Sequence, residues 1–272
     1  MRPATPPTRS FASTAASTDV TGSLTDRKVI ITGGGSGMGA ALTRAFPALG
    51  ADVVSLDIDE ESGRLTARES DASFVRCDVS SQESVDEAFA AAVELLGGLD
   101  VLIHAAGIAP ASPAAETDVA LWNQVMAVNA TGTFLTNVAA FAHLRDSGGR
   151  IINFASGAGV KGYPLKAAYA ASKGASLAWM RSIAVEWAPF GITVNAIAPA
   201  IWTPMYDRTR ASMSPEALLQ HDQTMSRTVP LGGKLGDAGT DLVPVLEFLA
   251  GDGARFMTGQ VFPVDGGLLM MR

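Results

Sequence analysis

The sequence predicts an α/β fold, a doubly wound domain in which a seven-stranded parallel sheet has helices on both faces. Short apolar runs without polar alternation recur along the chain, as expected for strands buried on both faces. Helical patterns separate these runs, and repeated strand–helix alternation is typical of a parallel sheet. The chain has 272 residues, which suits a single domain with a large core, and no linker divides it.

The apolar runs are the expected strands, and each ends where a polar or glycine-containing stretch begins. They span residues 28–32, 52–56, 73–76, 101–105, 150–155, 192–197 and 260–264. The expected helices run from the end of a glycine-rich loop to about residue 49, and over about 81–96, 118–146, 166–187 and 241–249. Ser81 is placed to cap one helix, and Pro189 and Gly191 to end another. Pro47 should fray the last turn of the first helix.

The longer and more polar segment 200–235 is expected to form a lid over the substrate. Right-handed crossovers place the carboxyl ends of parallel strands along one edge of the sheet, where ligands bind. The motifs described below all fall at such strand ends, so we expect them to meet at that edge.

Composition excludes several kinds of partner. The net charge of -7 and the lack of a basic stripe argue against a nucleic-acid partner. No run approaches 18 consecutive apolar residues, so no membrane span is expected. Cys77 is the single cysteine, which excludes an intrachain disulfide and is compatible with a reducing, cytoplasmic location. His143 and His221 have no ligand-spaced partner, so no metal site is expected.

Residues 1–24 differ from the rest of the chain because they are rich in Ser, Thr, Ala and Pro and contain no acid before Asp19. A flexible N-terminal arm is the expected structure. An organelle transit peptide has a similar composition, but the prolines here oppose an amphipathic helix. We therefore expect an arm over residues 1–24 and the folded domain over 25–272.

The first strand runs into a glycine-rich loop, Thr32–Gly39, at the start of a helix. Glycines let the backbone approach a pyrophosphate, and the helix N-terminus offers amide donors and a positive dipole. The spacing Gly-x-x-x-Gly-x-Gly departs from the strict dinucleotide fingerprint, but its place after a buried strand favours phosphate binding over a purely structural turn.

Asp57 ends the second expected strand, 18 residues after Gly39. A carboxylate at this position can accept hydrogen bonds from the ribose hydroxyls of adenosine and repels a 2′-phosphate. The glycine loop offers Ser36 and no Arg or Lys, so NAD is expected rather than NADP. The alternative is that Asp57 caps the next helix, a role for which Asp59 and Glu60 compete.

Tyr169 and Lys173 are four residues apart on an Ala-rich helix and so share one face. A nearby lysine stabilises the phenolate and is expected to lower the pKa of the phenol from about 10. A phenol tuned in this way can act as a general acid or base near neutral pH.

Taken together, these motifs resemble those of the short-chain dehydrogenase/reductase family, over residues from about 25 to 270. Ser156 precedes Tyr169 by the 13 residues that the family shows. The matching positions, in family order, are Thr32–Gly39, Asp57, Asp78-Val79, Ala105-Ala106-Gly107, Asn129, Ser156, Tyr169-x-x-x-Lys173 and Pro199 through Thr203. The resemblance implies a Rossmann-type dehydrogenase domain.

The resemblance also implies catalytic roles. Tyr169 would be the acid/base, and Lys173 would lower its pKa and bind the nicotinamide ribose. Ser156 would hydrogen-bond the substrate oxygen, and Asn129 would hold a water that relays protons from Lys173. Read without the family, Asn129 is a polar residue that perturbs its helix, and Ser156 a loop hydroxyl that bonds its own backbone.

The cofactor site that the resemblance implies draws on most of the strand ends. Asp78 and Val79 would contact the adenine, and Ile197 and Thr203 the nicotinamide end. The expected cofactor residues are Gly33, Gly35, Ser36, Gly37, Met38, Asp57, Ile58, Asp78, Val79, Ala105, Gly107, Tyr169, Lys173, Pro199 and Thr203.

Two positions depart from the family pattern. His104 stands in the place of a usual Asn, either as a proton-active group near the cofactor or as a packed, hydrogen-bonded side chain, and the second is favoured. Ala200 replaces the usual Gly after Pro199, which removes backbone freedom before Trp202.

The prediction is therefore an NAD(H)-dependent enzyme that interconverts a secondary alcohol and its ketone. The alternatives are an NADPH-dependent carbonyl or 3-oxoacyl reductase and a non-catalytic dinucleotide-sensing protein on the same fold. An apolar or cyclic alcohol is favoured over a sugar, and the residues expected at the substrate are Ser156, Tyr163, Trp202, Met205 and Tyr206. By resemblance, the chain should form a homotetramer through the helices at about 118–146 and 166–187.

Overall fold

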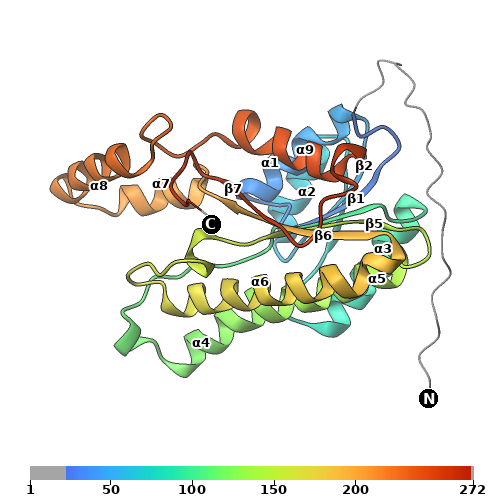
Figure 1. The fold of residues 1–272 in the computed structure, drawn as a ribbon, viewed down its shortest axis with the longest axis horizontal. Helices are drawn as coiled ribbons and strands as arrows, with labels where there is room; N and C mark the ends of the chain where they lie inside the picture. Colours follow the sequence, from blue (N-terminus) through green and yellow to red (C-terminus); the bar gives the residue numbers. More distant parts are fainter. Residues whose placement is uncertain (1–22, 271–272) are drawn as a thin grey trace.

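The sheet has seven strands in the order β3-β2-β1-β4-β5-β6-β7, and every neighbouring pair is parallel. The computed structural model describes residues 23–270 (Figure 1). The strands are β1 (Lys28–Thr32), β2 (Asp52–Asp57), β3 (Ser73–Arg76), β4 (Val101–His104), β5 (Gly149–Phe154), β6 (Ile192–Pro199) and β7 (Val261–Val264). The predicted doubly wound fold and its strand positions are confirmed.

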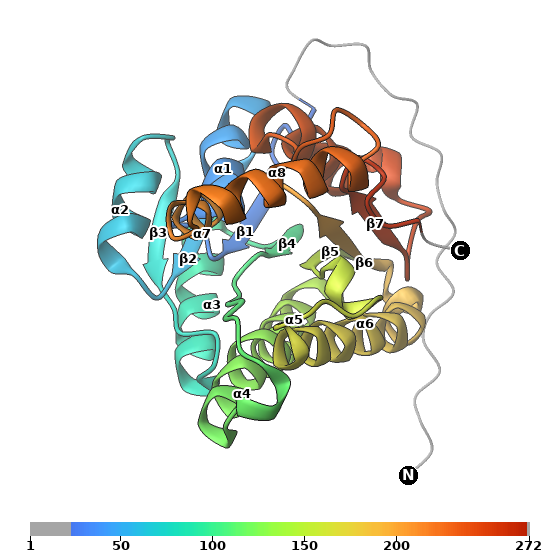
Figure 2. The same cartoon turned by 90° about the vertical axis from the view of Figure 1, so that its left-hand side faces the viewer.

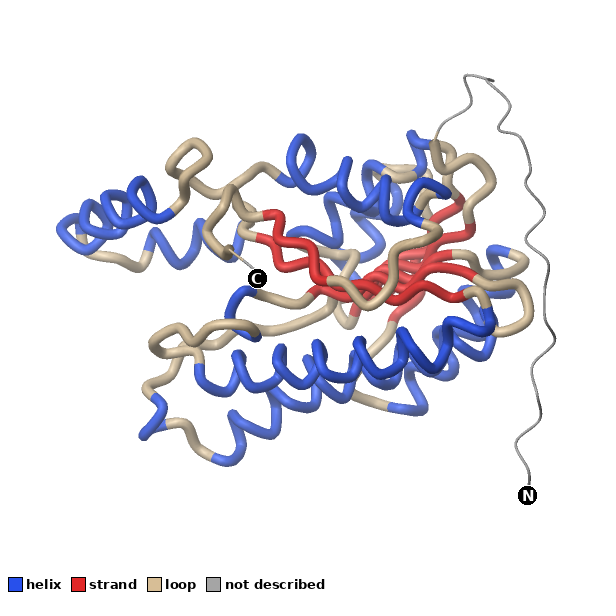
Figure 3. The backbone as a smooth tube through the Cα atoms, in the orientation of Figure 1, coloured by secondary structure: helices blue, strands red, loops and turns tan. Residues whose placement is uncertain are grey.

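Helices cover both faces of the sheet, which forms the middle layer in Figure 3. On one face lie α1 (Gly37–Ala45), α2 (Glu60–Arg68) and α9 (Val243–Ala250). On the other lie α3 (Gln82–Leu96), α4 (Val119–Met126), α5 (Gly132–Leu144) and α6 (Ala167–Trp187). Two further helices, α7 (Pro204–Ala211) and α8 (Pro215–Thr228), project beyond one end of the sheet (Figures 1 and 2).

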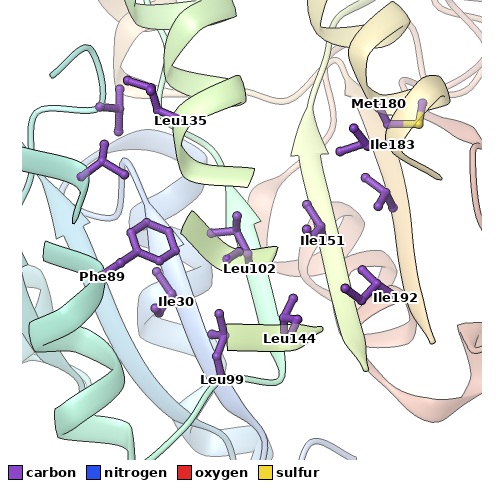
Figure 4. Close-up of a cluster of buried hydrophobic side chains, with 14 of the residues drawn as sticks. Ile30, Phe89, Leu99, Leu102, Leu135, Leu144, Ile151, Met180, Ile183 and Ile192 are labelled. Atoms are coloured by element: carbon purple, nitrogen blue, oxygen red, sulfur yellow. The ribbon is translucent and has the colours of Figure 1, made fainter. Parts of the chain in front are cut away.

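Each face of the sheet has its own hydrophobic core. Adjacent residues of a strand point to opposite faces, so Ile30 belongs to one buried cluster with Phe89 of α3 and Leu135 of α5, and Figure 4 shows Ile30 beside Phe89. Ile31 packs on the other face with Leu42 and other residues of α1 and α9. Fully burying one such side chain is worth roughly 1.5–3 kcal/mol. Because both faces of these strands are buried, successive residues are apolar, and the strands appear in the sequence as apolar runs.

The expected helix over residues 118–146 is present as one continuous helix, Val119–Leu144, formed by α4, a π turn (Ala127–Thr131) and α5. It is long and apolar enough to cross a membrane by composition, with a mean hydropathy of 1.3 over its most apolar window. This helix nevertheless packs against α3, α6 and strands β4 and β5. The core of the domain therefore accounts for part of its apolar residues, whereas Trp122, Phe134 and Val138 remain exposed.

Segment 200–235, the expected lid, contains two helices that were not expected from the sequence. The side chains of Thr203 and Ser214 cap α7 and α8 by accepting hydrogen bonds from backbone N–H groups three residues ahead. A proline follows each cap at the first helical position. These two Thr/Ser-Pro pairs were the available sequence signal for the helices.

The ends of the other elements follow their local chemistry. Ser81 caps α3 as expected, by accepting a hydrogen bond from the Ser84 backbone N–H. The helix α1 ends at Ala45, and Pro47 starts a short 3-10 turn, which is the predicted fraying. The expected N-terminal arm lies outside the described residues up to position 22, whereas Leu24 is fully buried in the core beneath α1 and α9. The folded domain thus begins no later than Leu24.

Candidate active site

A cavity of about 470 Å³ opens at the carboxyl edge of the sheet, between the strand ends and α7. It gathers most of the predicted site residues. Those that line it are Gly33, Ser36, Gly37, Met38, Asp57, Ile58, Asp78, Val79, Ala105, Gly107, Ser156, Tyr169, Lys173, Pro199, Thr203 and Met205. Its wall therefore combines the expected cofactor residues with the expected acid/base pair.

The glycine loop leaves room for a ligand at the start of α1. Gly37 has a φ of +55°, and a Cβ added to it would meet no atom within 4 Å, so the space over it is open. Gly33 has a φ of +68°, and its Cβ would lie 2.8 Å from the backbone of Ala106. Ser36 precedes the helix without using its side chain as a cap. The first amides of α1 thus face a space in which a pyrophosphate fits.

Asp57 is held in place by the loop and stays turned to the cavity. Its carboxylate accepts hydrogen bonds from the backbone N–H groups of Gly35 (2.9 Å) and Asp59 (3.0 Å). The competing role of helix cap falls to Asp59, which accepts from the backbone of Glu61 and Ser62 at the start of α2. Gly35 does not line the cavity. It lies behind Asp57, where its added Cβ would be 3.0 Å from a carboxylate oxygen.

Tyr169 and Lys173 lie together on α6, with the lysine Nζ 5.9 Å from the centre of the tyrosine ring. Lys173 is buried and donates a hydrogen bond to the Phe154 carbonyl (2.6 Å). Burial lowers the pKa of Lys173 to about 8. Burial also raises the pKa of Tyr169, and a hydrogen bond with Ser156 offsets part of that rise.

The predicted lowering of the Tyr169 pKa by Lys173 is therefore wrong for the protein alone. The cost of burying a phenolate exceeds the stabilisation that the phenol receives. The lysine charge is directed at the Phe154 carbonyl instead. The phenol consequently remains protonated at neutral pH.

Ser156 follows β5 and meets both expectations stated for it. Its hydroxyl accepts a hydrogen bond from the Ala158 backbone N–H (3.1 Å) and so caps a short 3-10 turn. The same side chain lines the cavity and interacts with Tyr169. The backbone bond fixes the orientation of the serine beside the phenol.

Asn129 lies in the π turn, fully buried, and does not line the cavity. Its amide exchanges two hydrogen bonds with the backbone of Ile108, both 2.8 Å, and donates a third to Ser172 Oγ (3.0 Å). A Cβ on Gly107 would lie 3.2 Å from Asn129 and 3.5 Å from the Lys173 Nζ, so the three positions adjoin. The amide thus ties α6 to the loop after β4, directly behind the lysine.

His104 is packed and hydrogen-bonded, as the favoured interpretation held. Its Nδ1 lies 2.9 Å from Thr32 Oγ1 and 3.1 Å from Thr136 Oγ1. Burial, together with the charge of Lys173, lowers the pKa of His104 to about 3. The imidazole is therefore neutral at neutral pH.

Ala200 directly follows β6 and is held by backbone hydrogen bonds to two other segments. Its N–H donates to the Val264 carbonyl (2.9 Å), and its carbonyl accepts from the Gly236 N–H (3.0 Å). Its φ is not positive, so no glycine is needed there.

The structure corrects the placement of three predicted substrate residues. Trp202 and Tyr206 pack edge to face and line a separate cavity of about 230 Å³ beside α8. Tyr163 lies over Gly157 and is also absent from the lining of the larger cavity. For Tyr206 the reason is helical geometry: Met205 faces the larger cavity, and Tyr206, one residue on, is turned about 100° away.

Some lining residues were not predicted. Ile108 and Ala109 follow the matched Gly107 directly, which was a signal for them. Gln124 and Val128 come from the long helix. Arg208 comes from α7. It lies four residues after Pro204 and so shares the cavity-facing side of that helix, which the sequence shows only once the helix is known.

A protein family model described as enoyl-(acyl carrier protein) reductase matches residues 33–269. A 2,5-dichloro-2,5-cyclohexadiene-1,4-diol dehydrogenase of Sphingobium indicum is 38% identical over 251 residues, covering 90% of this chain and 96% of the relative. The chain belongs to the short-chain dehydrogenase/reductase family. It is an oxidoreductase of the kind that acts on alcohols, and the family uses nicotinamide dinucleotide cofactors.

Other members of the short-chain dehydrogenase/reductase family are similar over most of their length. An L-fucose dehydrogenase of Bos taurus is 35% identical and covers 88% of each chain. A trans-4-hydroxycyclohexanecarboxylate dehydrogenase of Sinomonas cyclohexanicum is 34% identical over 89% of this chain and 92% of its own. The crystal structure of levodione reductase, 31% identical, superposes with a TM-score of 0.82 over 89% of this chain and 97% of its own.

The residues that line the cavity fit a nicotinamide dinucleotide, independently of the family membership. The open space over Gly37 can take a pyrophosphate, Asp57 can take a ribose, and Tyr169 and Lys173 line the same wall. Within residues 23–270, no group of three or more His, Cys, Asp or Glu side chains is placed to hold a metal ion.

Proposed function

We propose that this enzyme oxidises a secondary alcohol with NAD, or reduces the corresponding ketone with NADH, in the cavity at the carboxyl edge of the sheet. The observation that carries the proposal is that one cavity is lined by a dinucleotide cradle and by Ser156, Tyr169 and Lys173. An enzyme of this reaction type needs the acid/base beside the nicotinamide end of its cofactor, and the shared cavity supports that arrangement.

NAD is the proposed cofactor because of Asp57. Its carboxylate lines the cavity and is fixed by two backbone N–H groups, so it cannot easily turn away from a ribose. A 2′-phosphate at that position would meet a negative charge, and the loop 33–39 carries no Arg or Lys to compensate. This argues against the alternative, an NADPH-dependent carbonyl or 3-oxoacyl reductase.

Tyr169 is proposed as the proton donor and acceptor. Because burial raises the pKa of its phenol, the protein alone holds the proton needed to reduce a ketone. Ser156 holds the substrate oxygen beside that phenol and shares its developing charge. Lys173 supplies a positive charge behind the tyrosine, and bound dinucleotide supplies the hydride acceptor or donor. Oxidation of an alcohol needs the phenolate, so its rate should rise with pH.

An alicyclic secondary alcohol is the proposed substrate class. Ile108, Val128 and Met205 give the cavity apolar surface. The names of two relatives specify a cyclohexadiene diol and a hydroxycyclohexane carboxylate, whereas a third specifies the sugar L-fucose. Apolar lining favours the carbocycle over the sugar, because sugar hydroxyls require hydrogen-bonding partners when buried.

The proposal is tested with a panel of cyclic alcohols, acyclic alcohols and sugars, each with NAD and NADP, read at the nicotinamide absorbance. We expect turnover of cyclic alcohols with NAD at more than tenfold higher kcat/KM than with NADP. Tyr169→Phe should lose at least about a thousandfold in kcat and keep its Kd for NADH, because it lacks only the proton-transferring hydroxyl.

Three results would contradict parts of this proposal. Near-native activity in Tyr169→Phe would remove the tyrosine from catalysis. Higher activity with NADP would support the NADPH-linked reductase. Dinucleotide binding without turnover of any alcohol or ketone would support a non-catalytic sensor, against which the complete set of Ser156, Tyr169 and Lys173 now argues.

A further inference from the structure

The cavity has an uneven distribution of charge. Its charged residues within the described chain are Asp57, Asp78, Lys173 and Arg208. A dinucleotide pyrophosphate carries two negative charges, yet the glycine loop has no basic residue and the first cation of α1 is Arg44, in its last turn. Lys173 is buried on α6 beside Tyr169 and donates to Phe154. Backbone amides are therefore the donors on the loop side of the pyrophosphate, and a cation is missing there.

Arg208 is a cation in the cavity wall without a partner. It lies on α7, and among residues 23–270 its guanidinium makes no hydrogen bond or ion pair. Arg210, two residues later, differs in this respect. It forms a two-pronged ion pair with Asp222 and lies over the ring of Trp202 at 5.0 Å.

The geometry of α7 explains the difference. Pro204, Met205 and Arg208 are spaced three and four residues apart, so they share one face, and all three line the larger cavity. Tyr206 and Arg210 occupy the opposite face, which packs against α8. Contacts with α8 thus hold α7 in an orientation that presents Arg208 to the cavity.

We propose that Arg208 binds the pyrophosphate of the nicotinamide dinucleotide from the lid side, opposite the amides of α1. The planar guanidinium fork matches two phosphate oxygens, and such charge-assisted pairs are stronger than neutral hydrogen bonds. The proposal rests on the family's use of a nicotinamide dinucleotide and does not depend on whether that is NAD or NADP. Bound cofactor would then link α7 to the glycine loop.

The test compares Arg208→Gln with Arg227→Gln, which removes the same charge from α8 at a position outside the cavity. Dissociation constants for NADH and NADPH are measured by calorimetry at low and high salt, without substrate. We expect Arg208→Gln to weaken both dinucleotides about tenfold and to flatten the salt dependence. Arg227→Gln should bind as the unaltered protein does. Arg208→Lys, which keeps the charge and loses the fork, should recover part of the affinity.

Each other outcome contradicts the proposal in a distinguishable way. Unchanged affinity in Arg208→Gln would remove Arg208 from the cofactor site. A loss with NADPH alone would place the guanidinium at the 2′-phosphate. Unchanged affinity combined with a raised KM for substrates that bear a carboxylate would assign it to the substrate. Failure of the unaltered protein to bind either dinucleotide would overturn the cofactor assignment itself.

Discussion

Burial is the main cause of the shifted pKa values at the candidate active site. Tyr169 has a raised pKa, while Lys173 and His104 have lowered pKa values, and desolvation is the largest cause in all three. The motif predicted which residues would meet, but a spacing in sequence contains no information on how much water surrounds them. The identities at the site were therefore predictable from the sequence, whereas the direction of the Tyr169 shift was not.

His104 should make the stability of the protein depend on pH. Its pKa is about 3 in the folded protein and about 6.5 when unfolded, so below pH 6.5 the unfolded chain takes up a proton that the folded chain does not. Stability is thus fully present above pH 6.5 and is lost as the pH falls towards 3. Relative to pH 7.5, the loss at pH 5 is about 2 kcal/mol.

Denaturant titrations of the unaltered protein and of His104→Asn at pH 7.5 and pH 5 measure this contribution. The variant keeps a polar side chain and loses the titrating group, so its stability should fall less over that interval. Equal pH dependence in the two proteins would show that the imidazole is protonated without cost.

At the scale of elements, the central strands were predictable because both faces of the sheet demand mostly apolar residues. The helices α7 and α8 were not, because neither contains a buried residue and so neither imposes an apolar period. The π turn at Ala127–Thr131 was equally invisible to periodicity, because it adds one residue per turn inside an otherwise regular helix.

The π turn should depend on Asn129. Asn129→Ala removes three hydrogen bonds, to the backbone of Ile108 and to Ser172, and takes their partner from the partly buried N–H and C=O of Ile108. We expect a loss of about 2–4 kcal/mol in the free energy of unfolding, measured by urea titration. Asn123→Ala, at an exposed position on α4, is the matched control and should change stability by less than about 0.5 kcal/mol. A similar loss in both variants would mean that the hydrogen bonds of Asn129 contribute nothing specific.

At the scale of the whole molecule, the long helices leave an apolar surface uncovered. Trp122, Phe134 and Val138 on the α4–α5 helix, and Val185 on α6, are exposed by 39–78%. Exposed apolar surface marks association sites in soluble proteins, and these side chains lie on the two helices through which the tetramer is expected to form. This supports the proposal, first made by resemblance, of a homotetramer assembled through these helices.

Val185→Asp should weaken that assembly, because it places a charge on the surface that another copy would cover. Light scattering coupled to size exclusion should show a lower mass for the variant at micromolar concentration, with unchanged circular dichroism. Glu186→Gln, the neighbouring exposed position, serves as the control. A variant that keeps the mass of the unaltered protein would exclude Val185 from the interface.

The two faces of α7 have different surroundings. The face with Tyr206 and Arg210 is fixed to α8, while Met205 is about half exposed and lines the larger cavity. Under the proposed function, a change at Met205 should alter which alcohols the enzyme accepts and leave the contacts between α7 and α8 in place. Met205 is therefore a suitable first position to vary when the enzyme is adapted to bulkier or smaller alcohols.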